Sequence, residues 1–114
     1  MSDKRKDYRL YLLDIKSSCA KISKYTKGIS ETNFKKDHKT VDAVIKNLEV
    51  IGEAASKILP QIREKTHEIE WGKIVSMRNK LIHEYFDLNV DIVWETVTKD
   101  IPALKKQVNQ ALKK

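Results

Sequence analysis

Residues 71–86 read WGKIVSMRNKLIHEYF, and this stretch decides the fold. An α-helix turns by about 100° per residue, which places the apolar side chains of the stretch on one face. Those side chains are Trp71, Ile74, Val75, Leu81, Ile82 and Tyr85. Arg78 lies in the middle of the same face. A guanidinium is costly to remove from water, so Arg78 must meet an acid, a second subunit or an anionic ligand.

The rest of the chain repeats the helical spacing of apolar residues. The pattern predicts main helices over about 3–25, 41–59, 71–86 and 91–112, with a short helix around Phe34. The 114 residues include only three Gly and two Pro, and 40% are hydrophobic. We expect an all-α, up-down bundle of four main helices plus a short one, forming a single domain over residues 1–114.

Several residues are expected to mark where helices begin and end. Gly28 is predicted to end the first helix in a left-handed conformation, and Thr40 to cap the start of the third. Residues 64–70 are polar and predict a loop. Pro102 is expected to kink or restart the last helix, with Asp100 as the cap of the restarted half.

Composition excludes several classes of protein. A net charge of +7 favours a polyanionic partner. The single cysteine, Cys19, forms no disulfide framework, and His38, His67 and His83 lack metal-site spacing, so we expect neither metal nor cofactor. The chain has no apolar run of membrane-spanning length and no signal peptide. We therefore expect a cytoplasmic protein with no membrane contact.

Arg78 and His83 together suggest cleavage of RNA without a metal. Imidazole exchanges protons near neutral pH, and a guanidinium stabilises charge on a phosphate, so the 2′-hydroxyl could attack the adjacent phosphorus to leave a cyclic 2′,3′-phosphate. In an ideal helix, however, residues five apart point about 140° from each other and are offset by about 7.5 Å. A complete site requires either two such helices meeting across a two-fold axis or a helix that unwinds before His83. Alternatively, Arg78 pairs with Glu53 or Asp14 and His83 only caps the helix.

The sequence Arg78-Asn79-Lys80-Leu81-Ile82-His83-Glu84-Tyr85 resembles the Arg-Asn-x-x-x-His-x-Tyr signature of the HEPN superfamily, and most closely its HepT-type toxins. The similarity covers essentially the whole chain. Further matches are Ile51-Gly52-Glu53-Ala54, Trp71, Val93-Trp94 and the Ile101-Pro102 break.

The resemblance implies an all-α homodimer whose paired motifs form a composite, metal-independent ribonuclease site. It makes Arg78 and His83 catalytic, with Asn79 and Glu53 in support. It also implies a toxin–antitoxin module of a type II/VII-like kind. The partner would be an MntA-like nucleotidyltransferase antitoxin that transfers AMP to Tyr85, in a hetero-complex that could be larger than a dimer. The alternative is a non-catalytic HEPN protein that binds a nucleotide or nucleic acid beside a nucleotidyltransferase.

Overall fold

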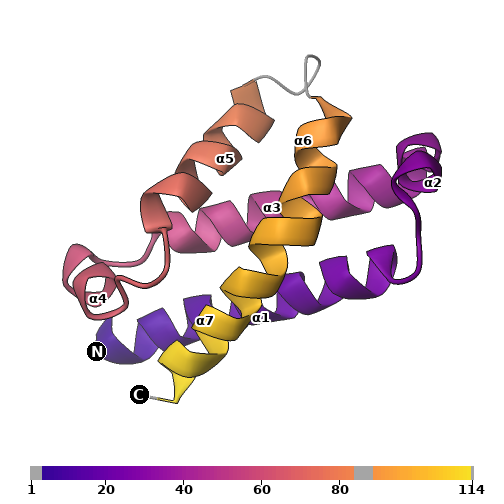
Figure 1. Ribbon diagram of the computed structural model, residues 1–114. Coiled ribbons are helices and arrows are strands. Elements are labelled where there is room, and N and C mark those ends of the chain that lie inside the picture. The colour runs from indigo at the N-terminus through magenta and orange to yellow at the C-terminus, as the bar shows by residue number, and fades with distance from the viewer. Residues whose placement is uncertain (1–3, 84–88, 114) are drawn as a thin grey trace.

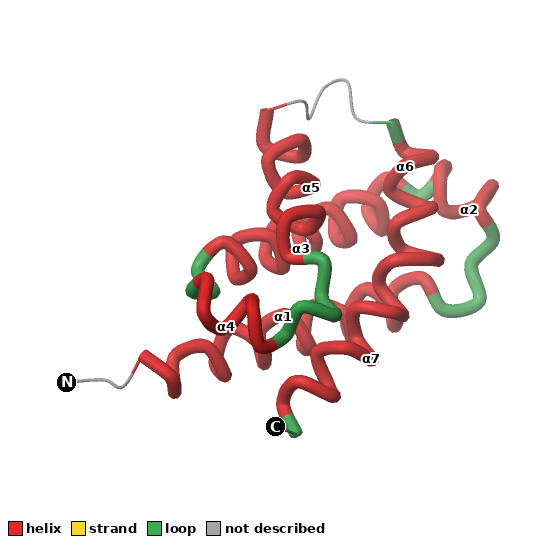
Figure 2. The backbone as a smooth tube through the Cα atoms, turned by 60° about the vertical axis from the view of Figure 1, so that its left-hand side comes forward, coloured by secondary structure: helices red, strands yellow, loops and turns green. Residues whose placement is uncertain are grey.

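A computed structural model describes residues 4–83 and 89–113, and the side chains of residues 8–81 and 89–113. The described residues form helices joined by turns, with no strand among them, so the predicted all-α class is confirmed (Figure 2). The elements are α1 Lys4–Thr26, α2 Glu31–Lys36, α3 His38–Ser56, α4 Pro60–Lys65, α5 Trp71–His83, α6 Val90–Glu95, the π-helix η2 Thr96–Asp100 and α7 Ile101–Leu112. None of the helices within the described ranges is both long and apolar enough to cross a membrane. The division into one domain over 1–114 stays a prediction.

Four long helical units build the bundle, as predicted: α1, α3, α5 and the continuous α6–η2–α7 unit. α3 packs against α1 on one side and α5 on the other, while α7 packs on α1 (Figure 1). Both termini lie at one end of the bundle and α2 lies at the other. The core is formed by the apolar stripes of these helices. Its fully buried side chains include Leu12, Ile15, Ile22, Phe34, Val44, Leu81 and Val108.

The predicted end of the first helix at Gly28 is confirmed, and the predicted cap of the third helix is wrong. Gly28 has a φ of 74°, the left-handed conformation expected after α1. Asn89 caps α6 by accepting a hydrogen bond from the Asp91 N–H. The cap of α3 is Asp37 and not Thr40: the Asp37 carboxylate accepts hydrogen bonds from the Thr40 N–H at 3.1 Å and from its hydroxyl at 2.6 Å. An ionised carboxylate is a stronger acceptor than a hydroxyl, so the helix begins three residues earlier.

The segment predicted as a polar loop over 64–70 is more ordered than expected. α4 extends to Lys65, which gives the fold a second short helix, and Thr66 and Ile69 are buried. The Thr66 hydroxyl donates to the Ile62 carbonyl and accepts a hydrogen bond at 3.1 Å from the indole N–H of Trp71. This contact anchors the first residue of α5, the helix that carries the motif.

Pro102 lies in the first turn of α7, which begins at Ile101, but Asp100 makes no side-chain cap bond there, so the predicted cap is wrong. The helix passes through the π-helix η2, in which the N–H of Ile101 donates to the carbonyl of Thr96, five residues earlier. Proline has no N–H, so the preceding turn cannot complete its usual hydrogen bonds, and widening it accommodates the ring. The carboxylate of Asp100 lies 3.4 Å from the ammonium of Lys73 on α5.

The buried thiol of Cys19 allows a direct test of the core. Burial raises its pKa to about 12, while the positive charge of Lys105 acts in the opposite direction. An unfolded thiol has a pKa near 9, so at pH 8 the folded chain holds about a thousandfold less thiolate. We expect alkylation by iodoacetamide to be slower by at least this factor in the folded chain than in guanidinium chloride, as followed by intact mass. Similar rates in the two conditions would contradict a closed core around α1 and α7.

Candidate active site

The helix α5 is held against the bundle by apolar side chains at its two ends. Trp71 is 4% exposed, and Leu81 is fully buried. Between them, Ile74, Val75 and Arg78 are half-buried on the same side of the helix. The side chain of Arg78 is 21% exposed, so the predicted charge on an apolar face is present in the folded chain.

Gly52 brings α5 close to α3 at the position of Arg78. A Cβ built on Gly52 would overlap the Cβ of Arg78 and lie 3.2 Å from its Cα. No other residue type fits there without moving one helix, because every other side chain begins with a Cβ. Gly52 therefore determines how deeply the backbone of Arg78 can enter the groove beside α3.

Glu53 supplies the acid that Arg78 needs. Nη1 of Arg78 lies 3.3 Å from Oε2 of Glu53 and donates a hydrogen bond to it. Asp14, the other candidate partner, makes no ion pair with Arg78. The Glu53 side chain is 54% exposed, and a solvent-exposed pair of this kind contributes no more than about 1 kcal/mol. It directs the guanidinium without locking it in place.

One nitrogen of Arg78 has no partner. Its Nε is buried and finds no hydrogen-bond acceptor among the described residues. A buried donor left unpaired costs about 1–3 kcal/mol. The ion pair with Glu53 therefore satisfies only part of the guanidinium, and an added acceptor beside α5 would be stabilised.

Arg78 and Glu53 lie in a surface hollow of about 310 Å³ where α1, α3 and α5 meet. Among the residues that the structure describes, the acidic and basic side chains that line it are Asp14, Lys46, Glu49, Glu53, Lys57 and Arg78. Three of these are cations and three are acids, so their charges balance. Tyr11 lines the same hollow, and the ammonium of Lys57 lies 5.9 Å from the centre of its ring.

Of the other predicted site residues, the structure describes Asn79 and the backbone of His83 but not Tyr85. Asn79 is exposed on α5. His83 is the last residue of α5, so the helix does not unwind before it, and that alternative is wrong. Arg78 and His83 are consequently separated by the full helical offset of about 140° and about 7.5 Å. Tyr85 lies outside the described residues.

A second cavity, of about 210 Å³, lies between α3, α5 and the C-terminal helix. It is lined mainly by apolar side chains, including Ile51 and Met77, and both partners of the Lys73–Asp100 ion pair line it as well. Arg78 does not line it. The side chains that the structure describes contain no group of three or more His, Cys, Asp or Glu placed to hold a metal ion.

Sequence reasoning did not predict Tyr11, Lys46 and Lys57 as neighbours of Arg78. Tyr11 lies beside the apolar stripe of α1, and its position off that stripe was the available signal. The two lysines resemble any others on a lysine-rich surface. Only the packing of α3 between α1 and α5 brings them to the hollow.

A family model described as "Ribonuclease HepT-like" matches residues 15–111. The chain belongs to the HepT-like ribonuclease family. It is 44% identical over 106 residues to "Putative RNase TTE0752" of Caldanaerobacter subterraneus subsp. tengcongensis, covering 93% of this chain and 95% of that protein. It is 41% identical over 101 residues to "Probable ribonuclease HepT" of Thermococcus cleftensis, covering 89% and 92%. No solved structure gives a significant match.

The match to the HepT-like family includes all three elements of the hollow. Tyr11 and Asp14 lie just outside the matched range of 15–111, whereas Glu53 and Arg78 lie within it. The resemblance inferred from the Arg78–Tyr85 motif is thereby confirmed at the level of the family.

Replacement of the two helical glycines should separate close packing from helix propensity. In Gly52→Ala the new methyl overlaps Arg78, and we expect the free energy of unfolding to fall by about 1–3 kcal/mol. The control is Gly72→Ala on α5, where nothing lies within 4 Å of an added Cβ, so stability should stay the same or rise by up to about 1 kcal/mol. Urea denaturation measures both. Equal stability of the two variants would show that α3 and α5 do not need glycine at their contact.

Proposed function

We propose that this chain is a cytoplasmic, metal-independent endoribonuclease whose active site is formed by two copies of α5. The observation that carries the proposal is that α5 stays helical to His83. One helix then cannot bring Arg78 and His83 together, since they point about 140° apart. Two helices related by a two-fold axis supply an arginine from one chain beside a histidine from the other.

Two features of the hollow support a second copy there. Val50 lines it and is 36% exposed, and Leu10, one turn before Asp14 on α1, is 60% exposed. Exposed apolar side chains beside a site favour a protein interface. The Nε of Arg78, which has no acceptor among the described residues, likewise leaves room for an acceptor such as a group of a second copy.

The chemistry needs only side chains. One His83 imidazole takes the proton of the ribose 2′-hydroxyl, and the oxygen attacks the adjacent phosphorus. Arg78 stabilises the charge on the crowded phosphorane through paired N–H donors. The His83 of the second copy, protonated, gives its proton to the departing 5′-oxygen. The products are a cyclic 2′,3′-phosphate and a free 5′-hydroxyl.

Glu53 and Asn79 support this site in different ways. Glu53 holds Arg78 through an exposed, weak ion pair, which RNA phosphate can replace at small cost because it offers a similar anionic acceptor. Asn79 lies one turn before His83 on α5. Residues four apart share a helix face, so its amide is positioned to orient the imidazole or the RNA.

The regulation that fits this site is addition of AMP to Tyr85 by an MntA-like nucleotidyltransferase antitoxin. The support is the family membership and the Arg78–Tyr85 motif. An adenylate adds negative charge and bulk beside the cationic Arg78, which would exclude an RNA phosphate by competition. The chain would then be the toxin of a toxin–antitoxin module, in a hetero-complex built on the dimer.

Cleavage in the presence of a chelator tests the site. We expect the purified chain to cut RNA in EDTA and to leave 2′,3′-cyclic ends, because no step uses a metal. Arg78→Ala and His83→Ala should each lower the rate by at least about a hundredfold, the usual loss when one acid–base or charge-stabilising group is removed. Denaturing gels and end analysis of the products measure this.

Lys36→Ala, on the exposed surface of α2, is the control and should retain full activity. Equal cleavage by wild type and the Arg78→Ala variant would reject the assigned site. A wild-type chain that never cuts RNA yet binds the transferase stably would support the non-catalytic alternative.

Modification gives an independent measurement. Incubation with ATP and a cognate nucleotidyltransferase should add the mass of AMP to the wild-type chain, with loss of RNA cleavage. Tyr85→Phe should gain no mass and stay active in the same mixture. Addition of AMP to Tyr85→Phe at the wild-type rate would exclude Tyr85 as the target.

A further inference from the structure

The net positive charge of the chain is confined to two segments. Residues 15–30 and 101–114 each contain four lysines and no Asp or Glu. The rest of the chain has 15 of the 23 Lys and Arg and all 16 acidic residues, which sums to −1. The surplus of +7 therefore comes from these two segments alone.

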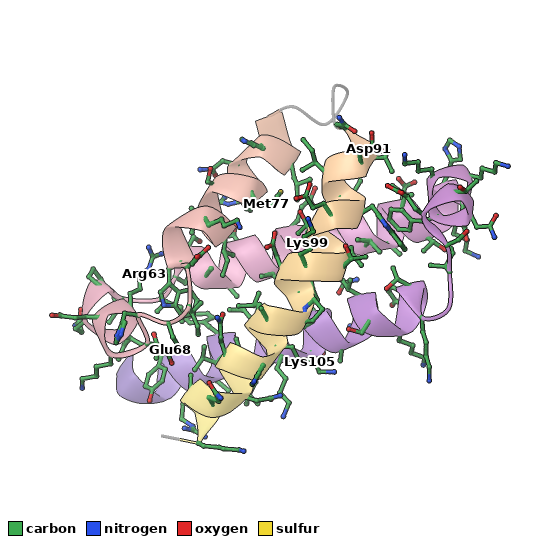
Figure 3. The ribbon with its side chains drawn as sticks, viewed as in Figure 1. Arg63, Glu68, Met77, Asp91, Lys99 and Lys105 are labelled. Carbon is green, nitrogen blue, oxygen red and sulfur yellow. The ribbon has the colours of Figure 1, made fainter. Side chains whose placement is uncertain are left out.

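The fold brings the two segments together. α1 and α7 pack against each other in opposite directions (Figure 1). Near the chain ends, Nη2 of Arg9 donates to the carbonyl of Leu112 at 3.0 Å. Further along, Lys105 is close enough to Cys19 for its charge to act on the thiol. Lys105 is labelled on α7 beside its crossing with α1 (Figure 3).

Several basic residues lie along the contact between α1 and α7, which we call the seam. Arg9 and Lys16 are seven residues apart and share one line of α1, the line that faces the end of α7. On α7, Lys105 lies seven residues, or two turns, before Leu112, whose backbone carbonyl accepts the hydrogen bond from Arg9. Lys106 follows Lys105 on the exposed side.

Two exposed lysines on α1 and α7 have no acidic partner among the side chains that the structure describes. Elsewhere Lys35, Lys57, Lys73 and Lys99 each lie within 4.0 Å of a carboxylate. In the described part of the chain, neither Lys16 nor Lys106 has such a pair. Both are exposed. A row of uncompensated cations attracts a polyanion and releases its counterions on binding.

We propose that this α1/α7 face, formed by Arg9, Lys16, Lys105, Lys106 and Lys113, binds the phosphate backbone of the RNA substrate away from the site of cleavage. The inference rests on the proposed ribonuclease function and names the form of its substrate. Tyr11 and Asp14 line the Arg78 hollow from the other flank of α1, about one helix diameter, or about 10 Å, from the face. An RNA must therefore be folded or long to reach both surfaces, and a few nucleotides fill only the hollow.

Binding to an RNA that cannot be cut tests the face separately from catalysis. The probe is a fluorescein-labelled hairpin made of 2′-O-methyl nucleotides, which lack the attacking hydroxyl. Anisotropy is recorded over a range of salt concentrations for wild type, Lys16→Gln/Lys106→Gln and the matched control Lys36→Gln/Lys39→Gln. The two variants have the same net charge, and Lys36 and Lys39 are exposed far from the seam, on α2 and at the start of α3. Circular dichroism checks that both variants remain folded.

The face variant should bind the hairpin several-fold more weakly. The slope of log K against log salt should become shallower by about 1.4–1.8, which is two phosphate contacts at about 0.7–0.9 each. The control should match wild type, and a single-stranded 2′-O-methyl tetranucleotide should bind all three proteins alike. Equal changes in the two variants would show a diffuse effect of net charge and overturn the face.

Unchanged binding by the face variant would also overturn the proposal and assign these lysines to another polyanion, such as an acidic protein. A wild-type chain that does not bind the hairpin at all would reject the face outright. A chain that binds the hairpin through the face yet never cleaves ordinary RNA would reject only the ribonuclease function.

Discussion

The contact between α3 and α5 at Gly52 constrains the rest of the structure. A Cβ on Gly52 would overlap Arg78, so the two helices can approach this closely only at a residue without a side chain. The approach brings the guanidinium beside α3, where the next residue, Glu53, is within 3.3 Å. Adjacent residues of α3 thus perform two separate tasks. Gly52 sets the depth of Arg78, and Glu53 sets its direction.

The same constraint explains how an arginine is tolerated on an apolar face. Its aliphatic stem packs against α3, while Nη1 reaches an exposed carboxylate at the rim. The compensation is partial, because Nε remains buried without an acceptor. A helix evolved only for stability would place an apolar residue here, since removing a charge from a buried site and filling the space is often neutral or stabilising. Retention of an incompletely paired arginine is easier to explain by chemistry than by packing.

Much of the fold could be predicted from the sequence, because apolar residues at helical spacing determine which faces are buried. Leu12, Ile15, Ile22 and Leu81 all lie where the periodicity places them. The wrong predictions concern positions where two neighbouring residues, or two local backbone conformations, could each have formed the helix boundary. Asp37 and Thr40 are both good caps, and only the relative strength of their hydrogen bonds, which the spacing of apolar residues does not reveal, selects Asp37. Pro102 is compatible with a kink, a restart or a widened turn in the linear sequence, and the structure has the widened turn η2 directly before it.

Of the candidate site, the sequence predicted mainly the residues of the Arg78–Tyr85 motif. The spacing of Arg78 and His83 indicates that one straight helix cannot place both in one cleft. Because α5 is helical as far as His83, the alternative in which the helix unwinds before His83 is excluded. Lys46 and Lys57 of α3 look like any other surface lysines in the linear sequence, and Tyr11 of α1 is marked only by its position off the apolar stripe, because these contacts depend on how three helices meet.

The charged residues are distributed differently on the two flanks of α1. On one flank, the Arg78 hollow contains equal numbers of cations and acids, which is suited to positioning a group and moving protons but attracts a polyanion weakly. On the other flank, the lysines of α1 and α7 have no acids in their segments at all. An active site that binds its substrate weakly can be assisted by a second binding surface. Binding energy from remote parts of a substrate can position the reacting group. Because α1 contributes residues to both flanks, the distance between them is fixed by one rigid helix. Under the proposed ribonuclease function, the α1/α7 face and the Arg78 hollow would be two parts of a single RNA-binding arrangement.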